Sequence, residues 1–497
     1  MTVPPPGDDG AARGAARRVA RNAGVRAVSE LVGKFASLAL MAVLARREGP
    51  SGLGVLVFAI AWCEVATAPV EMGFDRYLLR RVAADRADLD RSFFNVVTLK
   101  LARAVPAVAI SWALILALDY SSQTRIAVFV LTGSFLLDSL SYTAFASFNA
   151  VERGDLVGLT LVVQRLASGA AGVALLLSGF GVVAVAFAYL GASSIAFACA
   201  LVLMARHIGM PRRELPPGPR RELRRQSLPF AAQELLSVGI ARIDAILLSA
   251  LASQAVVGYY GAAYRLLEAT LFIPTALQGA FAAMYTYLDE RTEPTINAVF
   301  ARSMKLTLAL LVPCAVPLAV LPGQLLSLFF GGSFDSAVTP LRLLAPTVVV
   351  LGIVLLTGSL ITSRLDPRVL IRCFAVALVV NIALNLALIP SLGATGAAAA
   401  MLATEFAFAV LTLHLSVKAV GAIDPVSTCL GSIVAGAAMA GVMAALAGTL
   451  ALAIPAGGIA YVVVFALVER RFAPADLEFV TGLVRGRMPR RLAKSAG

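Results

Sequence analysis

The chain is 497 residues long, 59% of them hydrophobic and only 14% charged, with a formal net charge of +13. A soluble domain usually carries about 25% charged residues, so this composition excludes an ordinary soluble protein. The apolar residues come in stretches of about 20, long enough for a helix to cross a hydrocarbon layer of roughly 30 Å. Backbone polar groups in lipid need internal partners, and the stretches lack the alternation of barrel strands. The sequence therefore predicts an all-α, polytopic membrane protein.

About fourteen transmembrane helices are expected, because that many apolar stretches reach the required length. The first two lie close together, around a short turn at Gly49 and Pro50. The expected spans are 27–46, 52–73, 97–118, 126–148, 157–178, 182–205, 229–251, 256–284, 300–321, 338–362, 370–390, 395–417, 426–449 and 451–469.

Basic residues are unevenly distributed between the loops. Most of the 42 Lys and Arg residues fall in the two terminal tails, in 207–226 and in the loops on the same side. Because basic loops stay in the cytoplasm, both termini are expected there, and the protein is expected in the inner, cytoplasmic membrane. We expect the basic excess to contact anionic membrane lipids and not nucleic acid.

A Pro- and Arg-rich segment, HIGMPRRELPPGPRRELRRQ, divides the chain and is expected to be flexible or extended. The two sides show weak internal similarity. Aligning Gly54 with Gly258 gives an offset of roughly 204 residues, which favours two pseudo-repeated six-helix lobes that face one another. The expected parts are a cytoplasmic basic tail (1–26), an N-terminal six-helix lobe (27–206), a cytoplasmic linker (207–227), a C-terminal six-helix lobe (228–418), two additional helices (425–470) and a second cytoplasmic basic tail (471–497).

Ionisable groups inside the spans carry the chemistry, because a charge in lipid is costly unless it faces a cavity or a partner. The deepest expected cations are Lys34 in the first span, Arg242 in the seventh and Arg265 in the eighth. An arginine fork or a lysine point charge suits phosphate, so we expect these three side chains to bind an anionic headgroup. By helical spacing, Glu30 can pair with Lys34. Glu268 can pair with Arg265 in the same way.

Arg242 differs, because the acid on its own helix face, Glu234, lies about 12 Å along the helix. A buried cation without a partner is unfavourable, so an anionic ligand is expected beside it. Charges near the inner ends of the second and third spans are expected to extend to the headgroups instead: Glu71, Asp75, Lys100 and Arg103. The further cavity or coupling candidates are Glu30, Glu64, Asp138, Arg165, Glu234, Asp244 and Glu268.

Neither a metal site nor an ATP-binding loop is expected. The five cysteines fall in apolar segments without a CxxC pair, and the two histidines are far apart. The only Gly-Lys pair, Gly33 with Lys34, lacks the other residues of a phosphate-binding loop. Active transport must therefore use an ion gradient, the membrane potential or a substrate gradient. Na⁺ or H⁺ is the candidate coupling ion, and no other cofactor is expected.

Four stretches, in their order and spacing, resemble the polysaccharide-transporter and oligosaccharide-flippase branch of the multidrug/oligosaccharidyl-lipid/polysaccharide exporter superfamily. Residues 21–59 are similar to the opening helix pair of that branch, and 241–281 are similar to its seventh and eighth helices. Residues 340–367 are similar to its tenth helix, and the N-x₃-N-x₃-IP run in 379–407 to its eleventh and twelfth. Together the resemblance covers nearly the whole chain.

The resemblance implies two six-helix lobes around a central cavity that work by alternating access. It implies a substrate of oligosaccharide linked through pyrophosphate to a polyprenyl lipid, moved from the inner to the outer leaflet for surface polysaccharide assembly. In such a protein Lys34, Arg242 and Arg265 would occupy places comparable to those of basic cavity residues, and Asp244 would match a recurrent seventh-helix Asp. The expected partners are membrane lipids, this substrate and polysaccharide polymerase machinery. No enzymatic activity is implied.

Other functions stay open at this point. A cation-coupled multidrug exporter of the same superfamily would need an acid-dominated cavity, against which the deep cations argue. A flippase for the peptidoglycan lipid precursor would carry more Arg on its first two helices, where this chain has Glu64 and Glu71. A membrane-bound polymerase or glycosyltransferase would need a longer outer loop or a cytoplasmic domain with acidic or metal-binding residues.

Overall fold

The computed structural model describes residues 9–86, 88–211, 219–287 and 293–472, and within these ranges it contains helices and no strand. The chain forms two compact units. Unit 1 comprises Met1–Ala262, Phe329–Ser333 and Ile382–Ala394, and unit 2 comprises Ala263–Leu328, Phe334–Asn381 and Thr395–Gly497. These units are defined by packing and differ from the expected lobes, because the expected seventh span falls in unit 1. The lobe boundaries expected from the sequence therefore stay a prediction.

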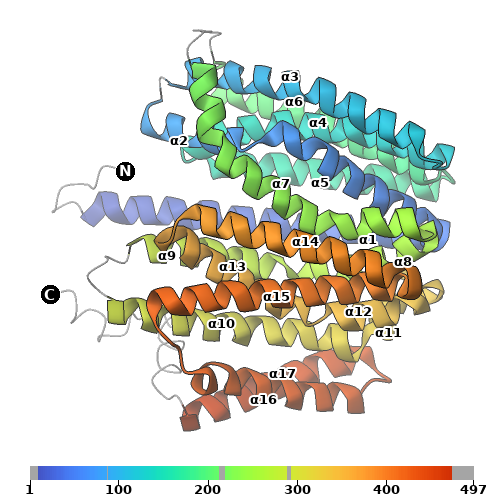
Figure 1. Ribbon diagram of the computed structural model, residues 1–497, viewed down its shortest axis with the longest axis vertical. Coiled ribbons are helices and arrows are strands. Elements are labelled where there is room, and N and C mark those ends of the chain that lie inside the picture. The colour runs from blue at the N-terminus through green and yellow to red at the C-terminus, as the bar shows by residue number, and fades with distance from the viewer. Residues whose placement is uncertain (1–8, 87, 212–218, 288–292, 473–497) are drawn as a thin grey trace. The chain divides into compact units, whose positions relative to one another are not determined.

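Unit 1 is a bundle of long helices that run side by side (Figure 1). The longest, α1, packs against α4, α5 and α7, and α6 packs against α4 and α5. The helices are α1 (Asp9–Glu71), α2 (Phe74–Ala84), α3 (Asp88–Ala117), α4 (Ser122–Ala150), α5 (Gly154–Leu177), α6 (Val182–His207), α7 (Pro219–Leu251) and α8 (Gln254–Thr270), the last of which continues into unit 2.

A kink divides α1 into the first two expected spans. Gly49 has φ 69° and ψ −168°, a conformation that glycine adopts at little cost, and it interrupts the helix. Pro50 follows, and proline is favoured at the first position of a helix because its missing N–H needs no partner there. Elsewhere the helices are longer than expected. Because α1 begins at Asp9 and α7 at Pro219, part of the basic tail and the last part of the linker are helical.

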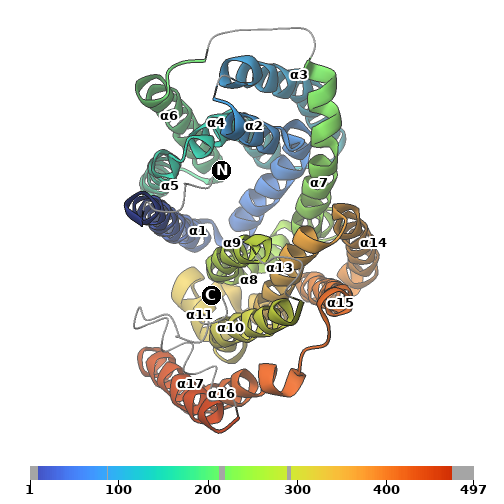
Figure 2. The ribbon, with the colours of Figure 1, turned by 90° about the vertical axis from the view of Figure 1, so that its left-hand side faces the viewer.

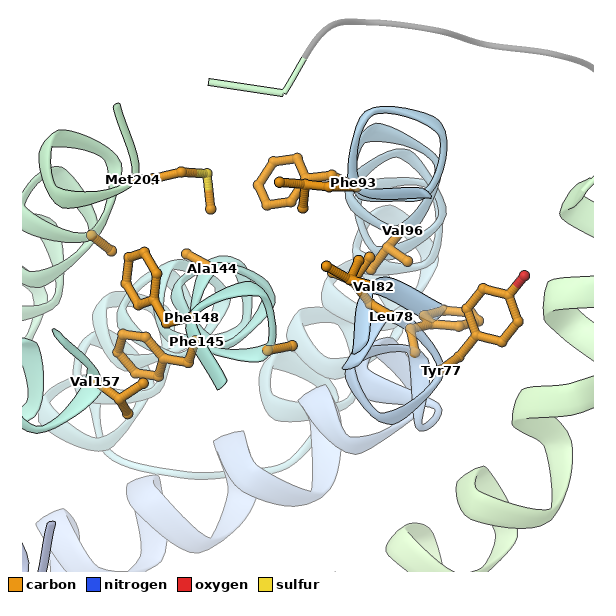
Figure 3. Close-up of a cluster of buried hydrophobic side chains, with 14 of the residues drawn as sticks. Tyr77, Leu78, Val82, Phe93, Val96, Ala144, Phe145, Phe148, Val157 and Met204 are labelled. Carbon is orange, nitrogen blue, oxygen red and sulfur yellow. The ribbon is translucent and has the colours of Figure 1, made fainter. Parts of the chain in front are cut away.

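One hydrophobic cluster in unit 1 is made of buried apolar side chains from α2, α3, α4, α5 and α6 (Figure 3). The short helix α2 contributes Leu78 and Val82, and α4 contributes Phe145 and Phe148. The helix α2 is amphipathic: its arginines are exposed on one face, and large apolar side chains are buried on the other. This pattern is typical of a helix that lies along a membrane surface with its apolar face covered.

Two glycines allow the second half of α1 to touch α8, at the positions that the repeat alignment pairs. A Cβ atom added to Gly54 would lie 1.8 Å from the carbonyl oxygen of Gln254. A Cβ atom added to Gly258 would lie 1.9 Å from the carbonyl oxygen of Pro50. The contact is reciprocal, because each glycine meets the carbonyl group four residues before the other. Only glycine permits so close an approach of two backbones.

Unit 2 is built around α10, which packs against α13 and α16. The last two helices pack against each other as a pair, and they lie side by side in Figure 2. Besides the rest of α8, the helices are α9 (Phe272–Tyr287), α10 (Glu293–Val320), α11 (Pro322–Phe330), η1 (Gly332–Ala337), α12 (Val338–Leu344), α13 (Thr347–Arg364), α14 (Pro367–Leu392), α15 (Ala394–Val420), α16 (Pro425–Ala445) and α17 (Leu450–Phe472), of which α14 ends in unit 1.

Eleven helices among the described residues are long and apolar enough to cross a membrane. One is Val32–Glu71, in which the kink at Gly49 separates two expected spans. The expected seventh and eighth spans fall on α7 and on α8 with α9, which are not among the eleven. The all-α, multi-pass architecture is thus confirmed, and the number of fourteen spans stays a prediction.

Candidate functional site

Arg242 and Glu64 form an ion pair between α7 and the second half of α1. The Nε and Nη2 groups of Arg242 donate to the two carboxylate oxygens of Glu64, the Nη2–Oε1 distance being 3.2 Å. The side chains are 22% and 27% exposed. Glu64 lies seven residues, or about 10 Å of helix, before the end of α1. The two-point contact is the geometry in which arginine grips carboxylates and phosphates.

The expectation that Glu234 is the acid available to Arg242 is therefore wrong. The spacing argument considered one helix, whereas the partner comes from another helix packed against it. Glu234 instead pairs with Arg76 of α2 at 3.3 Å, in an exposed contact. Beside it, Arg76 and Arg80 lie over the ring of Phe230. We place Glu234 in the surface contact between α2 and α7.

Lys34 lies on α1, half-buried, close to the contact of α1 with α5. A Cβ atom added to its neighbour Gly33 would lie 3.0 Å from Cγ of Arg165, so the stem of Arg165 passes directly over this turn of α1. Arg165 itself is exposed. Two cationic residues thus lie on adjacent helices of unit 1. The expected partner of Lys34, Glu30, has its side chain outside the described residues.

Lys100 is one of the most deeply buried charged residues described in unit 1, at 1% exposure. Its ammonium group donates to Glu71 at 2.9 Å, to Asp75 at 2.7 Å and to the carbonyl oxygen of Ser139 at 2.7 Å. Asp75 also accepts a hydrogen bond from Thr143 at 3.0 Å. The expectation that Lys100 extends to the headgroups is wrong, because α3 turns this side chain inward, where two carboxylates compensate its charge.

Two further acids in unit 1 are held by neutral side chains. Asp138 of α4 accepts a hydrogen bond from Gln164 of α5 at 2.6 Å, and Gln164 also donates to Ser193 of α6 at 3.1 Å. Asp244 of α7, 1% exposed, accepts from the Tyr260 hydroxyl at 2.9 Å. It also accepts from the amide of Asn385 at 2.6 Å, a residue of the N-x₃-N run that the sequence had marked.

In unit 2 the expected pair of Arg265 and Glu268 is confirmed, with a distance of 2.7 Å. A second ion pair was not expected from the sequence. Lys305 of α10 meets Glu469 of α17, and both side chains are almost fully buried. No local pattern marks this pair, because Arg302 lies three residues before Lys305 and Arg470 directly follows Glu469. Among the described residues, no group of three His, Cys, Asp or Glu side chains could hold a metal ion.

This arrangement of helices is found in known membrane transporters. The structure of the lipid II flippase MurJ in an inward closed conformation is similar with a TM-score of 0.73 at 14% identity, over 89% of this chain and 98% of that chain. A MATE-family multidrug resistance transporter of the MOP superfamily, in an inward-facing conformation, is similar with a TM-score of 0.62 at 15% identity, over 78% of this chain and 94% of that one. The protein has the fold of this class of multi-pass membrane proteins.

The chain belongs to the polysaccharide biosynthesis protein family, whose model matches residues 19–281. Two relatives come from Haloferax volcanii. The probable low-salt glycan biosynthesis flippase Agl15 is 25% identical over 172 residues, which are 34% of this chain and 36% of that protein. The probable flippase AglR is 28% identical over 206 residues, 40% of this chain and 43% of that protein. The chain thus matches well under half the length of each, and the resemblance expected from its motifs is confirmed.

Proposed function

We propose that the protein is a flippase that moves polyprenyl-pyrophosphate-linked oligosaccharide repeat units across the cytoplasmic membrane by alternating access, for surface polysaccharide assembly. The family, the flippase relatives and the multi-pass fold support transport and not catalysis. Both termini are cytoplasmic in this proposal. A polymerase that joins the flipped units is the partner that such a flippase would need.

One observation carries the proposal: the guanidinium group of Arg242, on a helix of a membrane protein, makes a two-point contact with a carboxylate, that of Glu64. Arginine binds a diphosphate through the same pair of donors. We propose that Arg242 and Lys34 of unit 1 bind the lipid pyrophosphate. Arg265 of unit 2, held by Glu268, is the third cation in the proposal.

The proposal predicts that Arg242→Ala abolishes surface polysaccharide while the protein stays at nearly normal abundance in the membrane. Lipid-linked repeat units should accumulate in the inner leaflet. Arg242→Lys should keep part of the function, because the charge remains while the two-point contact is lost. Arg265→Ala and Lys34→Ala should act in the same direction.

Arg153→Ala is the matched control, since it removes an arginine that pairs at 2.9 Å with Asp155 near the start of α5, outside the proposed binding residues. It should leave polysaccharide unchanged. Normal polysaccharide with Arg242, Arg265 and Lys34 all neutralised would refute the proposed binding residues. Loss of the protein from the membrane in these variants would show that the three residues are needed for folding and not for substrate binding.

A cation-coupled multidrug exporter is the second candidate, and the half-buried acid Asp138 and the buried acid Asp244 favour it. The same fold occurs in MATE multidrug transporters. That function predicts that cells lacking the protein retain cationic dyes and accumulate no lipid-linked sugar. Chemical identification of the lipid that accumulates on depletion also tests the peptidoglycan-precursor alternative, because the sugar composition differs.

A further inference from the structure

The Glu64 carboxylate occupies the position on Arg242 where a phosphate would bind. Its two oxygens take the Nε and Nη2 groups together, which form one edge of the planar guanidinium group. Carboxylate and phosphate use this edge in the same way. An anionic ligand that binds this edge must therefore first displace Glu64.

Arg242 is the ion-pair partner that the structure gives Glu64 within the described residues. Two other cations of unit 1 already have acids: Lys100 is shared by Glu71 and Asp75, and Arg76 is paired with Glu234. A ligand that displaces Glu64 leaves a half-buried carboxylate without its present counter-ion. This cost is the same for every anion, whereas the attraction to Arg242 grows with the charge of the anion.

We infer that Glu64 is a specificity-determining residue, an internal competitor that admits a lipid pyrophosphate and excludes the singly charged phosphodiester headgroups of the bilayer. The inference rests on the proposed function, because it assumes that Arg242 binds the pyrophosphate. Phospholipid headgroups surround the protein in great excess, so a cation without such a competitor would be occupied by them. Glu64 thereby also keeps Arg242 paired when no substrate is bound.

The test compares two soluble probes with the same tail, farnesyl pyrophosphate and the methyl phosphodiester of farnesol, which carries one negative charge. Binding to the purified full-length protein in neutral detergent is measured by calorimetry. The wild type should prefer the pyrophosphate by about tenfold or more, since charge pairs at such sites differ by more than 1 kcal/mol. In Glu64→Gln the cost of displacement is absent for both probes, so both should bind about tenfold more tightly, and the phosphodiester, excluded from the wild type, should then bind measurably.

Glu64→Asp keeps the charge on a shorter side chain and should give an intermediate gain in affinity, which preserves the test where the Gln variant does not fold. Asp155→Asn, which neutralises a paired acid elsewhere in unit 1, should leave both affinities unchanged. Unchanged affinities in both Glu64 variants, with binding lost in Arg242→Ala, would overturn this inference alone. Binding of the pyrophosphate that persists in Arg242→Ala would instead overturn the binding site under the proposed function.

Discussion

Lys100 carries a charge in the interior of unit 1, and the oxygen atoms around it explain why this is tolerated. Two carboxylates and a carbonyl group accept from its ammonium group at 2.7 to 2.9 Å. Such a cluster is stable as a whole, but the loss of one member leaves uncompensated charge in a medium of low dielectric constant. One ammonium group compensates two carboxylates, so removal of the lysine should be more damaging than removal of either acid.

We predict that Lys100→Ala destabilises the protein by about 3–5 kcal/mol, the usual cost of breaking a buried ion pair. Thermal unfolding of the detergent-solubilised protein measures the effect. Adding Glu71→Gln and Asp75→Asn should restore part of the loss, since the remaining groups are then neutral. Arg153→Ala, which breaks a more exposed pair, should cost about 1 kcal/mol or less. Equal effects of the two substitutions would contradict the role assigned to Lys100.

The site residues could be predicted from the sequence only where both partners lie on one helix. The pair of Arg265 and Glu268 follows from helical spacing alone. The partner of Arg242 does not, because spacing gives the face of a helix but not which helix packs against that face. Lys100 was misplaced for the same reason: its depth depends on how α3 is turned against α4.

At the scale of the helices, the crossing of α1 and α8 depends on the absence of side chains. Gly54 and Gly258 each face a backbone carbonyl that cannot move aside as a flexible side chain could. Near them, a Cβ atom on Gly261 would lie 2.5 Å from the side chain of Val57. An added methyl group must therefore push the two helices apart.

We predict that Gly54→Ala or Gly258→Ala destabilises the protein by about 1–3 kcal/mol, the typical cost of overpacking. Gly191→Ala is the control, because a Cβ atom there meets nothing within 4 Å. In the interior of α6 it should be neutral or stabilising by up to about 1 kcal/mol, as alanine is the better helix former. Thermal unfolding compares the three variants, and similar melting temperatures for all of them would show that the crossing is loose.

For the whole molecule, charge distribution predicts the orientation in the membrane. Ser333 and Ser363 are both exposed, and the expected topology puts them on opposite sides. In a variant that lacks all five native cysteines, Ser333→Cys should react with a membrane-impermeant maleimide added outside intact cells. Ser363→Cys should react only after the cells are opened. Labelling of Ser363→Cys from outside intact cells would show that the orientation in the membrane is the opposite of the expected one.

The fold class was accessible from the sequence because it depends on quantities that add up along the chain: the length of apolar stretches and the placement of charge. Boundaries were less accessible. The sequence suggests a polar tail before residue 27, whereas α1 begins at Asp9, since nothing in the Ala- and Arg-rich stretch after it stops a helix. The division into units depends on packing between distant segments, which local patterns do not encode.

The reciprocal contact of Gly54 and Gly258 gives this crossing a local pseudo-two-fold symmetry. A patch that meets its own equivalent, each residue facing the counterpart of its own neighbour, has the geometry that two identical subunits make across a two-fold axis. The two halves of the crossing are therefore equivalent, and a side chain added to either glycine meets the same obstacle, a backbone carbonyl group of the other helix.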